Sequence, residues 1–201
     1  MLTVITPATA TALTTVARAT AILGLDASHA AALALAIPAA SQAVVDHCRR
    51  PFAQETVREV FDHPSPRGVL LARAPATAIA SVTHGETALT VDDWRYDPET
   101  GLLQPMVGAF VGCWYAAPLT VEYTAGYTLP ADTGTWTLPA AVERAAVLLV
   151  GAALDATERD PLMRSEEIPG VRSVTWWVPD TRGLPSPEAE RLLEPYRRIV
   201  G

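Results

Sequence analysis

The sequence contains no lysine, because all 15 of its basic residues are arginine. This absence excludes a Walker-type phosphate loop, enzymes that form a Schiff base through lysine, and nucleophile pairs of the Ser-x-x-Lys kind. Cysteine is almost as scarce. Two cysteines, Cys48 and Cys113, are too few for a disulfide framework in 201 residues. We therefore expect two free thiols in a reducing compartment.

Positive charge is also in short supply. The chain carries 22 acidic residues and a net charge of −7, and residues 51–138 hold ten of the acids against four arginines. No basic stripe occurs along the sequence, which disfavours electrostatic binding to nucleic-acid phosphates. Hydrophobic residues make up 49% of the chain, enough to exclude global disorder and to form the core of a domain of ordinary size.

Two uncharged segments raise the question of export or a membrane. The start of the chain lacks the basic n-region of a secretory signal, and Pro7 and Arg18 interrupt its apolar stretch. Residues 27–45 are mostly alanine and include His29 and Pro38, whereas a membrane-spanning helix needs about 20 strongly apolar residues. We expect no signal peptide, a packed helix over 27–45 and no membrane partner.

Helical periodicity is found in three segments, 14–24, 28–49 and 139–158. Gly24 is a natural stop for the first segment, Pro38 should kink or divide the second, and Pro139 suits the first turn of the third. Between the second and third segments the pattern changes to short β-prone runs separated by turn residues. These runs are Thr56–Phe61, Val69–Leu71, Ile79–Thr83, Leu89–Val91 and Leu119–Tyr123. Their short spacing predicts antiparallel pairing in a β region over residues 56–127.

The last forty residues have a character of their own. Prolines and glycines interrupt residues 161–185, Trp176 and Trp177 lie inside that stretch, and a short helix begins after Ser186. This arm could dock onto another protein or fold back over its own core, and the residues favour neither. The sequence predicts an α+β protein with a mainly helical core, an antiparallel β insertion and this extended C-terminal arm. The predicted division is one domain over residues 1–160 and the arm over 161–201.

Residues that could carry chemistry are present but not arranged for it. The four histidines have no metal-ligand spacing, and no nucleophile elbow or phosphate cradle occurs. The acidic run from Asp92 to Glu99 is best explained as a solvated hairpin, and Cys113 in an apolar strand-like stretch as a buried structural thiol. We expect no catalytic residues, no metal and no cofactor.

Several motifs gain meaning from their order along the chain. They are Cys48-Arg49-Arg50-Pro51-Phe52 at a helix end, Leu70-Leu71-Ala72-Arg73-Ala74-Pro75 before the strand Ile79–Thr83, Trp94-Arg95-Tyr96-Asp97 with Gly101, Val121-Glu122-Tyr123-Thr124-Ala125-Gly126-Tyr127, the Ala-rich helix after Pro139, and Leu192-Leu193-Glu194-Pro195-Tyr196-Arg197. In this order they resemble the head–tail connector (adaptor) proteins of long-tailed bacteriophages and gene transfer agents. The resemblance covers roughly residues 14–200.

The resemblance implies a structural virion protein without enzymatic activity. Such a protein assembles in the host cytoplasm as a twelve-fold ring at the head–tail junction, joins the portal to the stopper or head-closure protein and the tail, and lets DNA pass through its lumen without specific binding. The implied portal-binding residues lie in the arm: Trp176, Trp177, Leu192, Leu193, Tyr196 and Arg197. The implied subunit interface uses Val142, Leu149 and Ala153, and the β region over 51–138 would face tail-side partners and adjacent subunits.

Two alternatives remain open from the sequence. A tail-completion protein one layer below would share the mixture of helices and strands but has little use for the C-terminal arm. A small hydrolase using Asp92, Asp93 or Asp97 would need a concave pocket with convergent polar groups.

Overall fold

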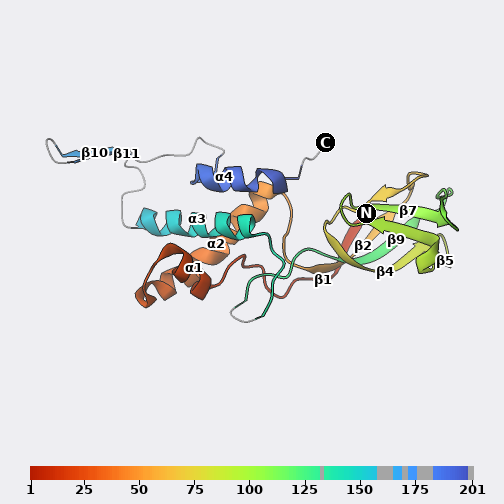
Figure 1. The fold of residues 1–201 in the computed structure, drawn as a ribbon, viewed down its shortest axis with the longest axis horizontal. Helices are drawn as coiled ribbons and strands as arrows, with labels where there is room; N and C mark the ends of the chain where they lie inside the picture. Colours follow the sequence, from red (N-terminus) through yellow and green to blue (C-terminus); the bar gives the residue numbers. More distant parts are fainter. Residues whose placement is uncertain (132–133, 158–164, 169–171, 176–182, 199–201) are drawn as a thin grey trace. The chain divides into compact units, whose positions relative to one another are not determined.

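The computed structural model describes residues 1–131, 134–157, 165–168, 172–175 and 183–198. The chain divides into two compact units, which are shown in Figure 1 and described here one at a time. The β unit comprises Met1–Thr9 and Ala53–Tyr127. The helical unit comprises Ala10–Phe52 and Thr128–Gly201. The predicted boundary at residue 160 lies outside the described residues.

The described part of the helical unit contains four α-helices, and local signals determine where they begin and end. They are α1 (Val16–Leu23), α2 (Ala30–Cys48, preceded by the 3₁₀ turn η1, Ala27–His29), α3 (Ala140–Thr157) and α4 (Pro187–Leu193, followed by the 3₁₀ turn η3, Glu194–Tyr196). The Thr15 and Ser186 side chains accept hydrogen bonds from backbone N–H groups in the first turns of α1 and α4. Gly24 ends α1 in the left-handed conformation, with φ of 66°. The predicted helices are confirmed to within two residues.

Pro38 neither divides α2 nor ends it, since the helix runs unbroken from Ala30 to Cys48. Proline removes one backbone donor and so leaves the carbonyl of Ala34 without its helical partner. Ala34 and Pro38 both lie on the exposed face of α2, where water can satisfy that carbonyl.

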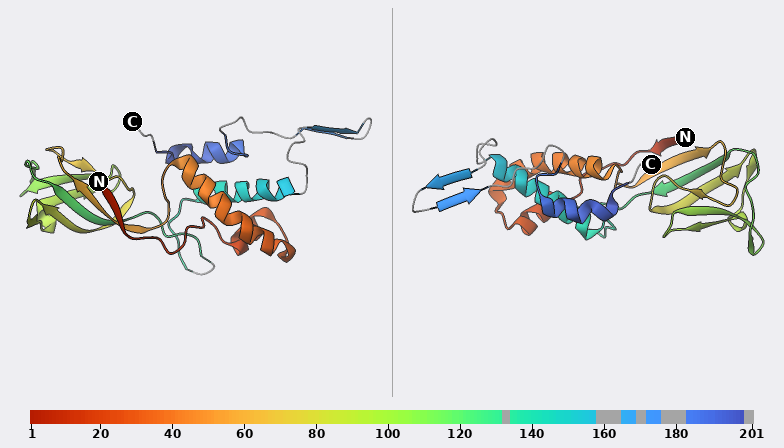
Figure 2. Two further views of the ribbon diagram at one scale, coloured as in Figure 1. Left: turned by 180° about the vertical axis from the view of Figure 1, so that it is seen from behind. Right: turned by 90° about the horizontal axis from the view of Figure 1, so that it is seen from above.

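The buried face of α2 packs against α3, and α4 packs against α3, as both views of Figure 2 show. The buried apolar side chains at these contacts are Leu33, Ile37, Val44, Val142, Val147, Val150, Ala189 and Leu193. Among the described residues one segment, Ala27–Cys48, is long and apolar enough by length and composition to cross a membrane. Its buried stripe nonetheless gives it a packing role inside the unit.

The β unit contains two antiparallel sheets. The first has the order β1-β2-β9-β4-β5, with β1 at Leu2–Thr6, β2 at Glu55–Phe61, β9 at Leu119–Ala125, β4 at Ala76–His84 and β5 at Thr87–Ala88. The second has the order β3-β7-β6, with β3 at Val69–Leu70, β7 at Leu102–Val107 and β6 at Trp94–Asp97, and β8 at Phe110–Val111 pairs with β7. The predicted antiparallel pairing is confirmed.

Strict alternation along the central strand β9 builds the core of the β unit. Leu119, Val121, Tyr123 and Ala125 are buried, while the residues between them are only partly covered. These side chains join a cluster that also includes Val57, Val69, Leu71, Val82, Leu103 and Trp114. The cluster takes residues from strands of both sheets, so the sheets share one core.

The structure corrects part of the strand prediction. Residues Leu89–Val91 do not form a strand, because Thr90 caps a 3₁₀ turn (η2, Val91–Asp93) in a reciprocal capping box with Asp93. Strands β1, β5, β6, β7 and β8 were not predicted as strands, and β1 pairs with β2 fifty or more residues away. In the helical unit, β10 (Ser165–Ile168) and β11 (Arg172–Thr175) pair antiparallel. The α+β class is confirmed, but with this many strands the protein is not mainly helical.

Candidate interaction surfaces

The C-terminal helix α4 lies on its own helical unit. Ala189 and Leu193 are fully buried, and the Leu184 N–H donates to the Glu190 carboxylate at 2.7 Å. Of the residues predicted to bind the portal, Leu193 is therefore part of this core, Leu192 and Tyr196 are half-buried, and Arg197 is exposed. Trp176 and Trp177 lie outside the described residues. For α4, the structure shows the folded-back arrangement.

The residues predicted for the subunit interface also differ in exposure. Val142 and Leu149 on α3 are buried inside the helical unit, whereas Ala153 on the same helix is exposed. A subunit contact made by α3 would therefore involve Ala153 and its exposed neighbours.

Two pairs of arginines that lie far apart in the sequence meet at the C-terminal end of α2. The Arg198 N–H donates to the Cys48 carbonyl at 2.9 Å, which brings Arg197 and Arg198 beside Arg49 and Arg50. We call these four residues the arginine patch. The aromatic rings of Phe52 and Tyr196 meet edge to face beside it, with centroids 6.4 Å apart. The sequence predicted no basic stripe, and the patch exists only because the chain folds back.

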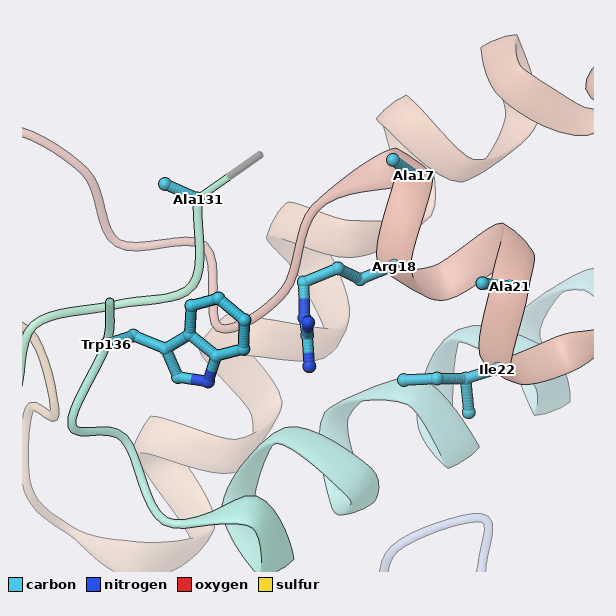
Figure 3. A pocket seen from close by; sticks show the side chains of 6 residues that line it. All are labelled: Ala17, Arg18, Ala21, Ile22, Ala131 and Trp136. Atoms are coloured by element: carbon cyan, nitrogen blue, oxygen red, sulfur yellow. The ribbon is translucent and has the colours of Figure 1, made fainter. Parts of the chain in front are cut away.

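A buried carboxylate joins α1 to α3 (Figure 3 shows the neighbouring side chains). Arg18 donates to both oxygens of Glu143, at 2.5 and 2.8 Å, and the Thr14 hydroxyl donates to the same carboxylate at 3.1 Å. The hydrogen bond to Glu143 raises the pKa of Arg18 above its usual value. The guanidinium also lies 4.1 Å from the centre of the Trp136 ring.

Beside this arrangement lies a hollow of about 260 Å³ lined by Ala17, Arg18, Ala21, Ile22, Ala131 and Trp136. It is smaller than the roughly 300–1,000 Å³ typical of small-molecule sites. Among the described residues Arg18 is the one charged residue in the lining, and its charge is already neutralised by Glu143. The described lining could hold an apolar side chain and lacks the convergent polar groups of an active site.

The β unit presents an apolar surface around the β7–β8 hairpin. No charged residue occurs between Gly101 and Glu122, and Val107, Phe110 and Tyr115 are each 70% or more exposed. Val107 and Phe110 lie on the hairpin and Tyr115 lies four residues after it. Exposed large apolar side chains, when they form a contiguous patch, are typical of a protein interface.

The acidic hairpin does not have the chemistry of a general acid. Asp93 accepts hydrogen bonds from the hydroxyl and the N–H of Thr90, at 2.7 and 2.8 Å, and Asp97 accepts from the Thr100 hydroxyl at 2.7 Å. These hydrogen bonds lower the pKa of both carboxyls. A general acid needs a raised pKa, so the two groups serve to hold the turns at either end of β6. The acidic run predicted as a hairpin forms part of η2, strand β6 and the start of the turn into β7, with which β6 pairs antiparallel.

The two cysteines are free, as expected, but Cys113 is exposed and not buried. The reason is that the next residue takes the buried position: the backbone N–H of Trp114 donates to the Pro66 carbonyl at 2.7 Å, and the Trp114 ring belongs to the core of the β unit. Cys48 is buried, and burial raises the pKa of its thiol to about 11. Within the described ranges, no three His, Cys, Asp or Glu side chains gather in a way that could hold a metal ion.

Comparison of the whole fold with solved structures finds matches in gene transfer agent particles. The chain matches, over 100% of its length and 98% of theirs, a protein in the neck of an empty gene transfer agent particle computed with C6 symmetry (20% identity, TM-score 0.59), and one in the virion of a native gene transfer agent particle (20% identity, TM-score 0.59). A third match, at 19% identity and a TM-score of 0.56, is in the neck of a native particle computed with C12 symmetry. The sequence matches no protein-family model and no curated protein. The fold is therefore one used by proteins of gene transfer agent particles.

Proposed function

We propose that this protein is the adaptor subunit of a ring at the head–tail junction of a gene transfer agent or long-tailed phage. In this role it joins the portal to the stopper and tail, and DNA passes through the ring. One observation carries the proposal: the full-length match to chains from symmetric necks, at a TM-score of 0.59. A match over both units is informative because it covers a particular combination of helical unit and β unit.

The chain's own properties support the proposal. A ring of subunits that each carry −7 would repel DNA phosphates at short range, and salt would screen this field beyond ~10 Å. DNA could then slide through without being gripped. Two of the three carboxylates considered for a hydrolase, Asp93 and Asp97, are held in turns with lowered pKa values, which favours a structural role for them.

Within this proposal each surface has a partner. The arm over residues 161–200, with Trp176, Trp177, Tyr196 and Arg197, binds the portal. The exposed apolar hairpin around Phe110 faces tail-side proteins or a neighbouring subunit, and Ala153 on α3 lies at the contact between subunits. Such contacts between unlike surfaces close into a ring when the rotation between subunits is an exact fraction of a turn.

The test is an affinity-tag pull-down from cells that produce the particles, with mass spectrometry of the bound proteins and negative-stain microscopy of the eluate. Portal subunits together with ring-shaped particles are expected. Recovery of tail-tube protein without portal would favour a tail-completion protein, and recovery of metabolic enzymes alone would contradict any role in the neck.

A further inference from the structure

We infer that the arginine patch, together with Tyr196, is a docking site for a carboxylate-rich segment of a protein partner. The inference deepens the proposed function, since Tyr196 and Arg197 belong to the surface assigned to the portal. The binding itself follows from this chain's own residues.

The first step is that folding, and not the sequence, concentrates the positive charge. Arg49 and Arg50 end α2, and the hydrogen bond from Arg198 to Cys48 places the second arginine pair at the same helix end. Arg50 and Arg197 both lie close enough to the Cys48 sulfur for their charges to oppose the effect of burial on its pKa. The two arginine pairs therefore lie at the same end of α2, although 146 or more residues separate them in the sequence.

The second step is that three of the four charges, those of Arg49, Arg197 and Arg198, are accessible to a partner. These three residues are exposed. Among the described residues, Arg197 has only a distant carboxylate, Glu194 at 4.0 Å, and none lies within that distance of Arg49 or Arg198. Exposed pairs at such a distance contribute little stability. If a carboxylate of a partner replaced Glu194 beside Arg197, the free energy of unfolding of the chain would hardly change.

The third step concerns Arg49 itself. Its φ of 54° makes it the only non-glycine residue with positive φ among those described, at a helix-ending position that favours glycine. A side chain with a Cβ is strained there. The positive charge complements the negative end of the α2 helix dipole, but glycine would relieve the strain. Glycine at this position therefore removes the charge without endangering the fold.

The fourth step is the choice between a protein and a nucleic acid. Asp46 and Glu194 flank the patch, and the chain as a whole is acidic, so a long polyanion would be repelled away from the four arginines. The electrostatic part of DNA binding grows with the number of phosphates that arginine and lysine neutralise, and four arginines can neutralise only a few. A short acidic segment fits a patch of this size, and arginine beside tyrosine is the composition of protein–protein hot spots. Arginine can also pair with each carboxylate through two hydrogen bonds.

The experiment measures binding of the full chain to a fluorescein-labelled Glu-Glu-Leu-Glu-Glu-Leu peptide by fluorescence anisotropy, at 50 and 200 mM salt. The same sequence with glutamine in place of glutamate, and a 20-base-pair DNA duplex, are the comparison probes. The variant Arg49→Gly/Arg197→Gln should weaken binding of the acidic peptide at least tenfold without lowering the melting temperature by more than a few degrees. Arg67→Gln, an exposed arginine of the β unit, is the matched control and should change binding less than twofold.

Failure to bind the acidic peptide, or binding that the double variant does not weaken, would overturn the inference. If the DNA duplex binds and the double variant weakens that binding, the arginine patch is a nucleic-acid site, and the inference is overturned as well. The pull-down described above tests the proposed function independently of the peptide experiment. If the protein captures the portal but does not bind the peptide, this inference is wrong and the adaptor role stands. If it binds the peptide but does not capture the portal, the adaptor role is wrong and this inference stands.

Discussion

Glu59 and Glu143 are the two buried carboxylates among the described residues, one in each unit, and each accepts at least two hydrogen bonds. Glu143 receives Arg18 and Thr14. Glu59 accepts from the Tyr123 hydroxyl at 2.8 Å and from the Ala72 N–H at 2.9 Å, while Tyr123 in turn accepts from the Arg73 N–H at 3.1 Å. Buried carboxylates are tolerated only with such partners, because an unpaired charge in the core is costly.

Tyr123 gives this arrangement a measurable pH dependence. Burial raises the pKa of its hydroxyl well above 10, so the folded state keeps the proton at pH values where the unfolded state loses it. The stabilisation is complete below pH 10 and falls by about 1.4 kcal/mol per pH unit above it. Tyr123→Phe should lose about 1–3 kcal/mol at pH 8, because Glu59 and the Arg73 N–H each lose a partner.

Urea unfolding of both proteins between pH 8 and pH 11 checks this prediction. The difference in unfolding free energy between wild type and Tyr123→Phe should shrink above pH 10. Ionisation of Cys48 affects both proteins equally and cancels in this comparison. A difference that stays constant over the whole range would show that the hydroxyl is not held in its neutral form.

The two thiols should differ sharply in reactivity. With a pKa of about 11, Cys48 is about one part in a thousand thiolate at pH 8, and it is also buried. Cys113 is exposed. Iodoacetamide at pH 8 should therefore add one group per native chain, at Cys113, as read by mass spectrometry of tryptic peptides. Two carbamidomethyl groups on the native protein, or one at Cys48, would contradict the burial of the Cys48 side chain. Denatured protein is the control and should take up two groups.

At the scale of elements, the end of β9 depends on one glycine. Gly126 has φ of 103°, and a Cβ there would lie 2.3 Å from the Ala53 carbonyl oxygen. Its N–H donates to the Pro75 carbonyl at 2.9 Å, and the next residue, Tyr127, forms a parallel bridge with Ala53. The Tyr-x-x-Gly-Tyr motif found in the sequence thus has a physical reason: two backbone segments pass too close for any side chain.

Gly126→Ala should therefore destabilise the protein by about 3 kcal/mol, since a backbone atom and not a flexible side chain must give way. Gly101→Ala is the matched control. It also has positive φ, 75°, but nothing lies within 4 Å of the added Cβ, so only the conformational cost of about 1–2 kcal/mol applies. Thermal unfolding of the two variants compares them directly. Equal losses would mean that the close approach to Ala53 is absent in solution.

At the scale of the whole molecule, the proposed portal contact rests on the arm. Replacing both Trp176 and Trp177 with alanine should abolish portal binding in the pull-down and leave the melting temperature nearly unchanged. Tyr115→Ala removes an exposed aromatic side chain of the β unit and should keep portal binding. A large drop in melting temperature for the double tryptophan variant would place these rings in the core of the protein.

The sequence by itself determined the features that depend on near neighbours. Thr15, Gly24 and Ser186 mark helix ends through contacts within three or four residues, and the alternation along Leu119–Ala125 needs no distant partner to be recognised. The α+β class and the antiparallel pairing followed from these local patterns. The exposure of Cys113 did not, because it depends on a hydrogen bond between Trp114 and Pro66 across forty-eight residues.

Only the tertiary structure decided which distant segments meet. It brought β1 to the edge of the first sheet, joined Arg18 to Glu143 across 125 residues, and laid α4 against α3. It also gathered Arg49 and Arg50 with Arg197 and Arg198 in a chain whose sequence shows no basic stripe. The reason is that such contacts depend on the packing of whole elements, which residue order along the chain does not encode locally. Charge spread along the sequence can therefore become a concentrated patch in the folded protein.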